Sequence, residues 1–487
     1  MSGYRPNTTL ANLHENTAYQ YGLLAAITLL AAVLRFYKLG EWSLWIDEIF
    51  TINRAEIHLN DMAIFLRNLP DTLWLPLSLI FTKFFLNLFG VSEWSARLAP
   101  ALIGILSIPI LYFSARKVIG SGAALVMALL LAVSPWHLFW SQNARFYTSL
   151  MLIYTLAAFA FFFAFERNRP RYILLFYVFL YFAASERLTV VFILPVILMY
   201  LATLWLFRFE LPPGLGKRNL IILIAPMLLM ATVDVIRYLA TGSSIMIFAI
   251  DAFAGQQFDD PPRLLVAIGF NISLPIISLA LVGGLHLLLR KRRVGLFFML
   301  SALLPMALLV ILNPFMFTKD RYVFMTLPCW LILAAIAIQE LITHTKEGGK
   351  LLAVGILLVL VAEAAGTNLL YYRVNNGGRR DWRAAFEIMK SESREDDVFV
   401  AWWPEFGPYY LGKEIIPWKD IRPDAVLESG VRYWFLVDSE TIWGNPVMRE
   451  WVMSNTVLID VLYLRLPEDD FNLMLYLYDP AKNLVRE

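Results

Sequence analysis

Residues 121–165 read SGAALVMALLLAVSPWHLFWSQNARFYTSLMLIYTLAAFAFFFAF, in which two apolar runs flank the polar turn SQNAR. Each run, 121–140 and 147–165, has roughly the 20 residues that a helix needs to cross the ~30 Å hydrocarbon core of a bilayer. Further apolar runs stand at 20–36, 98–115, 172–184, 188–207, 219–240, 264–289, 294–313, 322–342 and 351–370. The sequence therefore predicts an α-helical polytopic membrane protein with about eleven spanning helices.

The composition supports the membrane class and marks a second domain. Only 16% of the residues are charged, whereas a soluble domain has about 25%. Charged residues become frequent after residue 370, so we predict a transmembrane domain over 1–370 and a soluble α/β domain over 371–487. Its expected helices are DWRAAFEIMKSES and VMREWVMSN, and its expected strands are DDVFVAWW, VRYWFLVD, TVLIDVLYLRL and FNLMLYLYD. The net charge is only +2, and the basic residues occur in short clusters between apolar runs. A nucleic-acid surface would need a basic face, so this pattern argues against a nucleic-acid partner.

Basic residues in the loops predict the orientation. If the N-terminus is cytoplasmic and the interrupted run 74–89 does not span, all basic clusters fall on one side, as the positive-inside rule requires. These clusters are Arg116/Lys117, Arg167/Arg169/Arg171, Arg208/Lys217/Arg218, Arg290/Lys291/Arg292/Arg293 and Lys346/Lys350. We therefore expect a multi-pass protein of the plasma membrane, with an uncleaved first span. The outer face would carry the loop 37–97 and the C-terminal domain, and the run 74–89 either lies at the interface or spans.

Two adjacent carboxylates, Asp47 and Glu48, stand in the first outer loop within KLGEWSLWIDEIFT. A carboxylate buried against aromatic residues at the bilayer surface has a raised pKa and suits a general base. The alternative is an aromatic belt with solvated acids beside it. The pair could also hold a divalent cation, although the sequence identifies no further ligand, so metal dependence stays open and no cofactor is certain.

Two cationic clusters are expected on the same outer face. Gln142 and Arg145 follow an apolar helix, and Lys319, Arg321 and Tyr322 stand at the mouth of a late span. Arginines here can bind a phosphate, or they can contact lipid headgroups instead. Acids, cations and aromatic residues together suit transfer from a lipid-linked phosphate donor. The leaving phosphate needs cations, the acceptor hydroxyl needs a base, and the lipid tail needs the bilayer.

In this order, the motifs resemble those of the polyprenyl-phosphate-dependent glycosyltransferases of the protein O-mannosyltransferase superfamily, which have the GT-C fold. The resemblance rests on SLWIDEIFT, SEWSARLAPALIGILSIPILYFSARK, SPWHLFWSQNARFYTSLMLIYTLAAF, KDRYVFMTLP and DWRAAFEIMKSESREDDVFVAW. It implies a polyprenyl-phosphate sugar donor used on the outer face, with inversion at the anomeric carbon. It matches Asp47 with the family's base or acceptor-positioning acid, with Glu48 as the substitute. It also matches Arg321 with a contact to the donor phosphate, and it places Arg145 in the SQ-x-AR-x-Y element.

One motif departs from the family pattern. Residues 73–77 read LWLPL, without the polar partner that many relatives place there, so either Asp71 takes that role or the acceptor site differs. The sugar is not fixed, and the acceptor is a lipid, a glycan or a protein. A transporter or lipid flippase is the alternative function, but acidic residues deep in the apolar runs are few, and Asp234 and Glu363 lie near the outer ends of their runs. A non-catalytic scaffold for the C-terminal domain would not need the Asp47–Glu48 pair.

Overall fold

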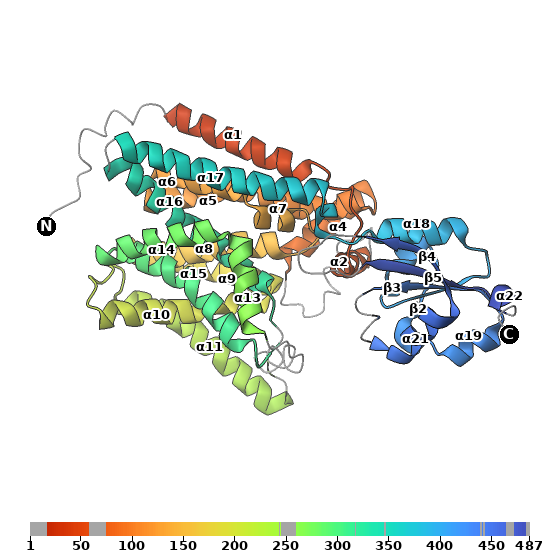
Figure 1. The fold of residues 1–487 in the computed structure, drawn as a ribbon. Helices are drawn as coiled ribbons and strands as arrows, with labels where there is room; N and C mark the ends of the chain where they lie inside the picture. Colours follow the sequence, from red (N-terminus) through yellow and green to blue (C-terminus); the bar gives the residue numbers. More distant parts are fainter. Residues whose placement is uncertain are drawn as a thin grey trace.

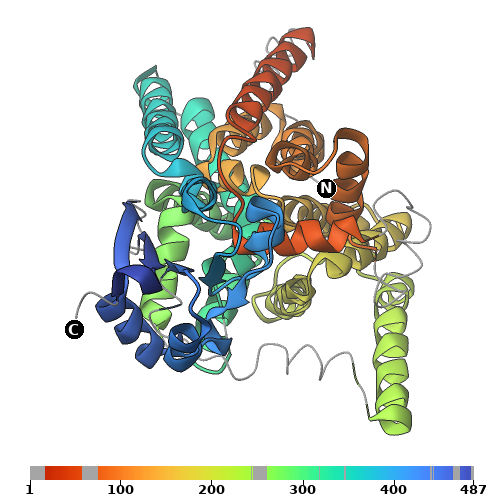
Figure 2. The same ribbon diagram turned by 90° about the vertical axis from the view of Figure 1, so that its right-hand side faces the viewer.

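A bundle of long helices joins, at one end, a smaller domain built on a mixed β-sheet (Figure 1). This computed structural model describes residues 17–57, 75–242, 244, 260–316, 318–344, 347–438, 441, 444–463 and 472–483. We call the end of the bundle that meets the sheet domain the domain-side end. Figure 2 looks onto this end, and the sheet domain lies over part of it.

The bundle contains α-helices and two short 3₁₀ segments. Their bounds are α1 (Thr17–Phe36), α2 (Ile46–Glu56), α4 (Leu77–Phe89), α5 (Glu93–Ile119), α6 (Ser121–Val133), α7 (Pro135–Ser141), α8 (Tyr147–Glu166), α9 (Arg171–Glu186), η2 (Leu188–Phe192), α10 (Ile193–Leu206), α11 (Lys217–Thr241), α13 (Pro261–Ile272), α14 (Leu274–Leu289), α15 (Arg293–Leu312), η3 (Asp320–Thr326), α16 (Leu327–His344) and α17 (Glu347–Arg373).

The membrane-protein class is confirmed. Among the described residues, eight helices are long and apolar enough to cross a bilayer. Two further pairs of consecutive helices, each bent at a short break, bring the number to ten if each pair is counted as one span. The pairs are α6–α7, bent by 58°, and α13–α14, bent by 86°. The expected eleventh span, 172–184, forms α9, whose 16 residues extend only about 24 Å at 1.5 Å per residue. This length is less than the ~30 Å hydrocarbon core, but α9 runs back along α8, because Glu186 at its end accepts a hydrogen bond from Ser149 at the start of α8 (2.7 Å).

The run 74–89 forms the short helix α4. Its 13 residues extend only about 20 Å, which favours the interfacial alternative. The buried Lys83 of α4 donates hydrogen bonds to the carbonyls of Ala55 (3.0 Å) and Ile57 (2.9 Å), at the end of α2. These carbonyls have no partner within α2, so Lys83 fixes the C-terminus of that helix. Asp71 lies outside the described residues.

The C-terminal domain has the expected α/β character. Its sheet has the order β2-β1-β3-β5-β4, in which β1 pairs in parallel with β2 and β3, and β5 pairs antiparallel with β3 and β4. The predicted helices and the four predicted strands are all present. The elements are η4 (Asn376–Gly378), α18 (Trp382–Glu392), β1 (Val398–Ala401), η5 (Gly407–Leu411), β2 (Ile416–Pro417), η6 (Trp418–Asp420), α19 (Pro423–Ser429), β3 (Tyr433–Val437), α21 (Pro446–Asn455), β4 (Val457–Leu462), β5 (Leu473–Tyr478) and α22 (Pro480–Asn483).

The sheet domain is packed firmly on the first loop of the bundle. Ile49 and Ile52 of α2 share one buried cluster with Phe386, Phe399 and Leu436 of the sheet domain. The Leu44 amide donates to the Tyr410 hydroxyl (2.8 Å), and the Ser43 hydroxyl donates to the Arg380 carbonyl (2.7 Å). The domain therefore helps to set the position of α2.

Candidate active site

The predicted acid pair lies in the first turn of α2, where negative charge is favoured by the helix dipole. Consecutive residues of an α-helix point about 100° apart around the axis. The two carboxylates consequently have different surroundings. Asp47 is 23% exposed, whereas Glu48 is fully buried.

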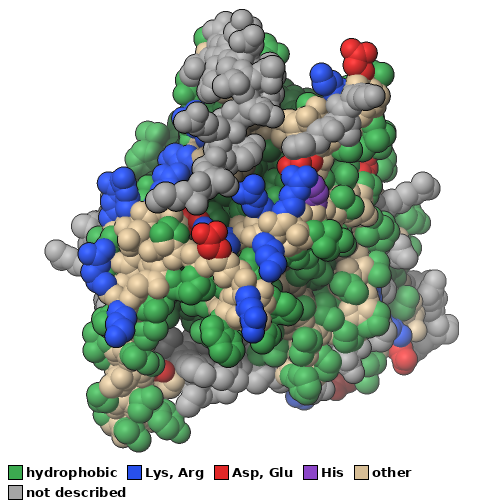
Figure 3. All heavy atoms as spheres, turned by 90° about the vertical axis from the view of Figure 1, so that its left-hand side faces the viewer, with side chains coloured by type: hydrophobic (Ala, Val, Ile, Leu, Met, Phe, Trp, Pro, Cys, Tyr) green, Lys and Arg blue, Asp and Glu red, His purple; other side chains and the backbone are tan. Residues whose placement is uncertain are grey.

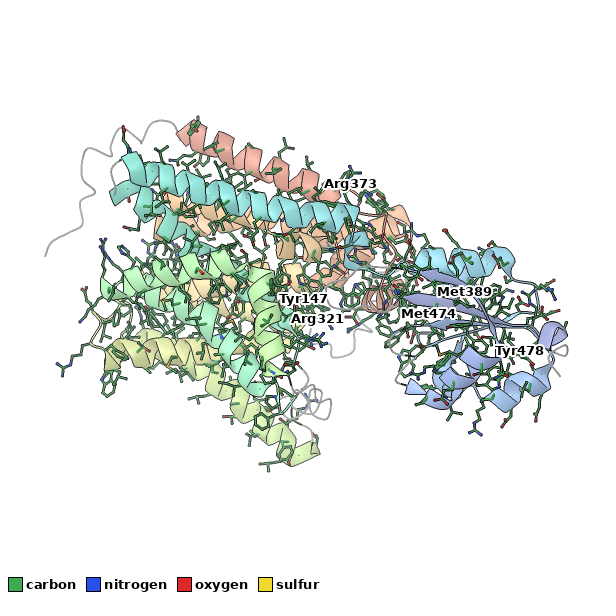
Figure 4. The ribbon with its side chains drawn as sticks, viewed as in Figure 1. Tyr147, Arg321, Arg373, Met389, Met474 and Tyr478 are labelled. Atoms are coloured by element: carbon green, nitrogen blue, oxygen red, sulfur yellow. The ribbon has the colours of Figure 1, made fainter. Side chains whose placement is uncertain are left out.

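Asp47 faces two of the predicted arginines. Its Oδ2 atom lies 3.5 Å from Arg145 Nη2 and 3.9 Å from Arg321 Nη2. Arg145 Nη1 also donates to the Asp47 carbonyl (2.9 Å) and to the Thr51 hydroxyl (3.1 Å). Residues from α2, from the turn after α7 and from η3 are thus brought together. Figure 4 shows Arg321 beside Tyr147 at the domain-side end, facing the sheet domain.

A third arginine, Arg187, belongs to the same cluster. Its guanidinium carbon lies 4.2 Å from the centroid of the Tyr322 ring and 5.5 Å from that of Phe146. Arg145 lies over the same Phe146 ring at 5.1 Å. Arg187 was not among the residues expected from the sequence, although its place in an outer turn, next to Glu186, was the available signal. The described contacts also give Tyr322 a clear role, because its buried ring supports Arg187.

The cluster carries an excess of positive charge. Besides Asp47, it includes the acid Asp320, whose Oδ2 accepts a hydrogen bond from Asn271 at 2.5 Å. The Nε atoms of Arg145 and Arg321 are buried and have no hydrogen-bond partner among the described residues. A buried donor without a partner is costly. An anion with several oxygen atoms, such as a phosphate, would satisfy these donors. Lys319 is exposed next to this cluster.

Glu48 is enclosed by a hydrogen-bond network. Arg97 donates to it through Nε (2.9 Å) and Nη2 (2.8 Å), and the Ala144 amide donates at 2.8 Å. Burial alone would raise the pKa of Glu48, but the guanidinium groups of Arg97 and Arg379 lower it to about 2. Glu48 is therefore ionised at neutral pH, and its oxygens already have donors.

Arg97 links Glu48 to the loop before α2. It also donates to the carbonyls of Leu39 (3.2 Å), Trp42 (2.8 Å) and Ser43 (2.9 Å). The Glu48–Arg97 pair consequently fixes the backbone that leads into Asp47. Arg97 was not among the residues expected from the sequence, where it stands just before an expected span.

Gln142 lies in the protein interior and not in the arginine cluster. Its amide nitrogen donates to the carbonyls of Arg35 (2.9 Å) and Tyr37 (2.8 Å), and its amide oxygen accepts from the Tyr371 hydroxyl (2.9 Å). These bonds tie the end of α1 to α17. They leave no donor of Gln142 directed at Asp47.

The described side chains do not suggest a metal site here. They contain no group of three or more His, Cys, Asp or Glu that could hold a metal ion. Asp47 and Glu48 also pair with different arginines and do not face one another. The residues present thus fit an anion better than a divalent cation.

The fold is thus a helical membrane domain with a soluble domain packed on the end where a loop carboxylate faces two arginines. Residues 75–229 match the model of the dolichyl-phosphate-mannose-protein mannosyltransferase family. The match covers about a third of the chain, and together with the fold it confirms the resemblance to GT-C glycosyltransferases that was drawn from the motifs.

Solved structures show the same fold. ArnT from Cupriavidus metallidurans is 14% identical with a TM-score of 0.57, and the match covers 95% of this chain and 99% of ArnT. ArnT has also been solved with bound undecaprenyl phosphate. The oligosaccharyltransferase AglB from Archaeoglobus fulgidus, solved with an inhibitory peptide and a dolichol-phosphate, is 12% identical with a TM-score of 0.56; the match covers 94% of this chain and 74% of AglB. No curated protein sequence matches the chain.

Proposed function

We propose that the protein transfers a sugar from a polyprenyl-phosphate donor to an acceptor hydroxyl at the domain-side end of the bundle. The observation that carries this proposal is the contact of Asp47 with Arg145 and Arg321, whose buried Nε–H groups lack partners among the described residues. The solved relatives with bound undecaprenyl phosphate or dolichol-phosphate support the choice of donor.

In the proposed reaction, the arginines hold the donor phosphate while the polyprenyl tail stays in the bilayer. Asp47 accepts the proton of the acceptor hydroxyl, whose oxygen forms a bond to the anomeric carbon. The bond from that carbon to the phosphate oxygen breaks, and polyprenyl phosphate leaves with the electron pair. The arginines stabilise the charge that develops on the phosphate. A single displacement opposite the phosphate inverts the anomeric configuration. Glu48 positions Asp47 in this scheme and does not accept the proton.

A strain that lacks the protein provides the cellular test. We expect the polyprenyl-phosphate sugar to accumulate and one sugar modification of the envelope to disappear. Mass spectrometry of lipid extracts and of envelope lipids, glycans and proteins measures both changes. Unchanged lipid-linked sugars and an unchanged envelope would contradict the proposal, and the modification that is lost would identify the acceptor.

The proposed site lies on the outer face. Figure 3 shows the end of the bundle opposite the sheet domain, where lysine and arginine side chains gather. Arg116 and Lys117 stand there in the last turn of α5, and Arg292 precedes α15. By the positive-inside rule we assign this end to the cytoplasm.

We expect an impermeant thiol reagent to label a cysteine at Tyr463 in intact cells but not one at Arg292. The single native cysteine, Cys329, is buried and gives little background. Labelling at position 292 together with protection at position 463 would place the site on the wrong face. Lys346, the other expected cytoplasmic marker, lies outside the described residues.

Arg321→Ala is expected to reduce donor use far more than Lys319→Ala. A guanidinium can make two parallel bonds to a phosphate, whereas a lysine acts as a point charge. Loss of a contact that strengthens on the leaving phosphate should raise the barrier by roughly 2–4 kcal/mol. The measurement is kcat/KM for a synthetic polyprenyl-phosphate hexose. Equal and mild effects of the two substitutions would indicate contacts with lipid headgroups instead.

A further inference from the structure

The exposed side of α2 leads from Asp47 directly to the sheet domain. Phe50 lies three residues after Asp47, so the two side chains are neighbours on one helix face, with Cβ atoms roughly 5–6 Å apart. Phe50 is 40% exposed although it stands in the part of the chain where the two domains meet. Figure 1 shows α2 between the bundle and the sheet. An acceptor whose hydroxyl reaches Asp47 would therefore extend along Phe50.

Trp403 of the sheet domain completes an aromatic corner with Phe50. The two ring centroids are 6.1 Å apart, and the ring planes meet at 82°. Trp403 follows the carboxyl end of β1, which has a parallel strand on each side. In open α/β sheets, ligands bind outside the carboxyl ends of parallel strands, where the strand order reverses. The corner occupies this position and is one helical turn from Asp47.

The loop after β1 also contains a carboxylate, one oxygen of which accepts no hydrogen bond from the described residues. Glu405 stands two residues after Trp403, and its Oε2 atom is buried without a hydrogen-bond partner among the described residues. Such atoms are rare in native proteins and call for a ligand or ordered water. A carboxylate oxygen accepts hydrogen bonds from hydroxyl groups, of which a sugar ring carries several.

We propose that the corner formed by Phe50 and Trp403, with Glu405, binds a polyhydroxylated acceptor, namely a glycan, and this inference rests on the proposed transferase function. The apolar C–H face of a sugar ring packs on an aromatic side chain, and its hydroxyls reach the carboxylate. A peptide acceptor fits this edge less well. Strand β1 is already paired on both sides, so an extended peptide cannot add to the sheet there.

The test uses the purified full-length protein and a synthetic polyprenyl-phosphate hexose that the wild-type protein consumes. Methyl glycosides and blocked oligosaccharides are compared with peptides that contain serine and threonine. We expect at least one saccharide, and none of the peptides, to accelerate release of polyprenyl phosphate. Acceleration by peptides alone, or by neither class, would overturn the glycan assignment. A wild-type protein that consumes no donor at all would instead refute the proposed function.

Substitutions locate the acceptor site. Trp403→Ala should raise the KM for the active saccharide by at least about tenfold, as expected for a truncated aromatic anchor. Trp403→Phe should restore most of the affinity, and the KM for the donor should stay within about twofold in both variants. Tyr463→Ala is the matched control, because Tyr463 is 81% exposed after β4, at the far edge of the sheet from Trp403. An unchanged acceptor KM in Trp403→Ala, or equal changes in the KM values for donor and acceptor, would exclude the corner as the acceptor site.

Discussion

The variant Asp47→Asn is expected to lose at least ~10²-fold in turnover, within the range for a lost general base. The substitution keeps the size of the side chain and removes its basicity. Asp47 is the partly exposed member of the acid pair and contacts the arginines proposed to hold the donor phosphate. An acceptor hydroxyl beside Asp47 would therefore also be next to the sugar of a donor whose phosphate these arginines hold.

Turnover is measured as sugar transfer from a synthetic polyprenyl-phosphate donor, and donor binding is measured separately. We expect the KM for the donor to change much less than kcat, since Arg145, Arg187 and Arg321 are intact in this variant. Thermal unfolding in detergent should be close to that of the wild-type protein, because Asp47 makes only long contacts with its arginines, at 3.5 and 3.9 Å. Near-normal turnover in Asp47→Asn would remove Asp47 from the role of base.

The variant Glu48→Gln is expected to lose stability, by about 3–5 kcal/mol in the free energy of unfolding. Glu48 and Arg97 are fully buried, and their shortest contact is 2.8 Å. Removal of one charge leaves the other buried without compensation. The matched control is Glu56→Gln at the end of the same helix, where we expect a change within about 0.5 kcal/mol because Glu56 is exposed.

The pH dependence of unfolding distinguishes the contribution of Glu48 to stability from a role in catalysis. The pKa of Glu48 in the folded protein is about 2, below its ordinary value of 4.5. A lowered pKa gives stability that is fully present above about pH 4.5 and is lost as the pH falls towards 2. The wild-type protein should lose this component over that range, and Glu48→Gln should lack it at every pH. Equal stability of Glu48→Gln and the wild-type protein at pH 7 would contradict the structural role.

The sequence predicted the parts of the fold and of the candidate site that depend on local patterns. Apolar run length predicted most of the spans, and short strand-like segments predicted the four longer strands. Asp47, Arg145 and Arg321 were expected on one face because the loop charges set the topology, and the structure brings these side chains into contact. The bends within the α6–α7 and α13–α14 pairs, by 58° and 86°, were harder to predict, because an apolar run does not mark where a helix bends.

Other features depend on contacts between distant residues. Glu48 and Arg97 are 49 positions apart, and nothing near Glu48 in the sequence marks it as the buried member of the acid pair. Gln142 looked like a site residue because it stands beside Arg145, but its amide is used within the protein. Arg187 joins the cluster through a long-range contact with Tyr322.

Turnover by the purified wild-type protein in liposomes is the most direct test of the central claim. The liposomes contain a synthetic polyprenyl-phosphate hexose, and both polyprenyl phosphate release and movement of the intact lipid between leaflets are measured. We predict protein-dependent release of polyprenyl phosphate, reduced at least ~10²-fold by Asp47→Asn. Movement of the intact donor between leaflets without cleavage of its sugar–phosphate bond would contradict the account and indicate a lipid flippase.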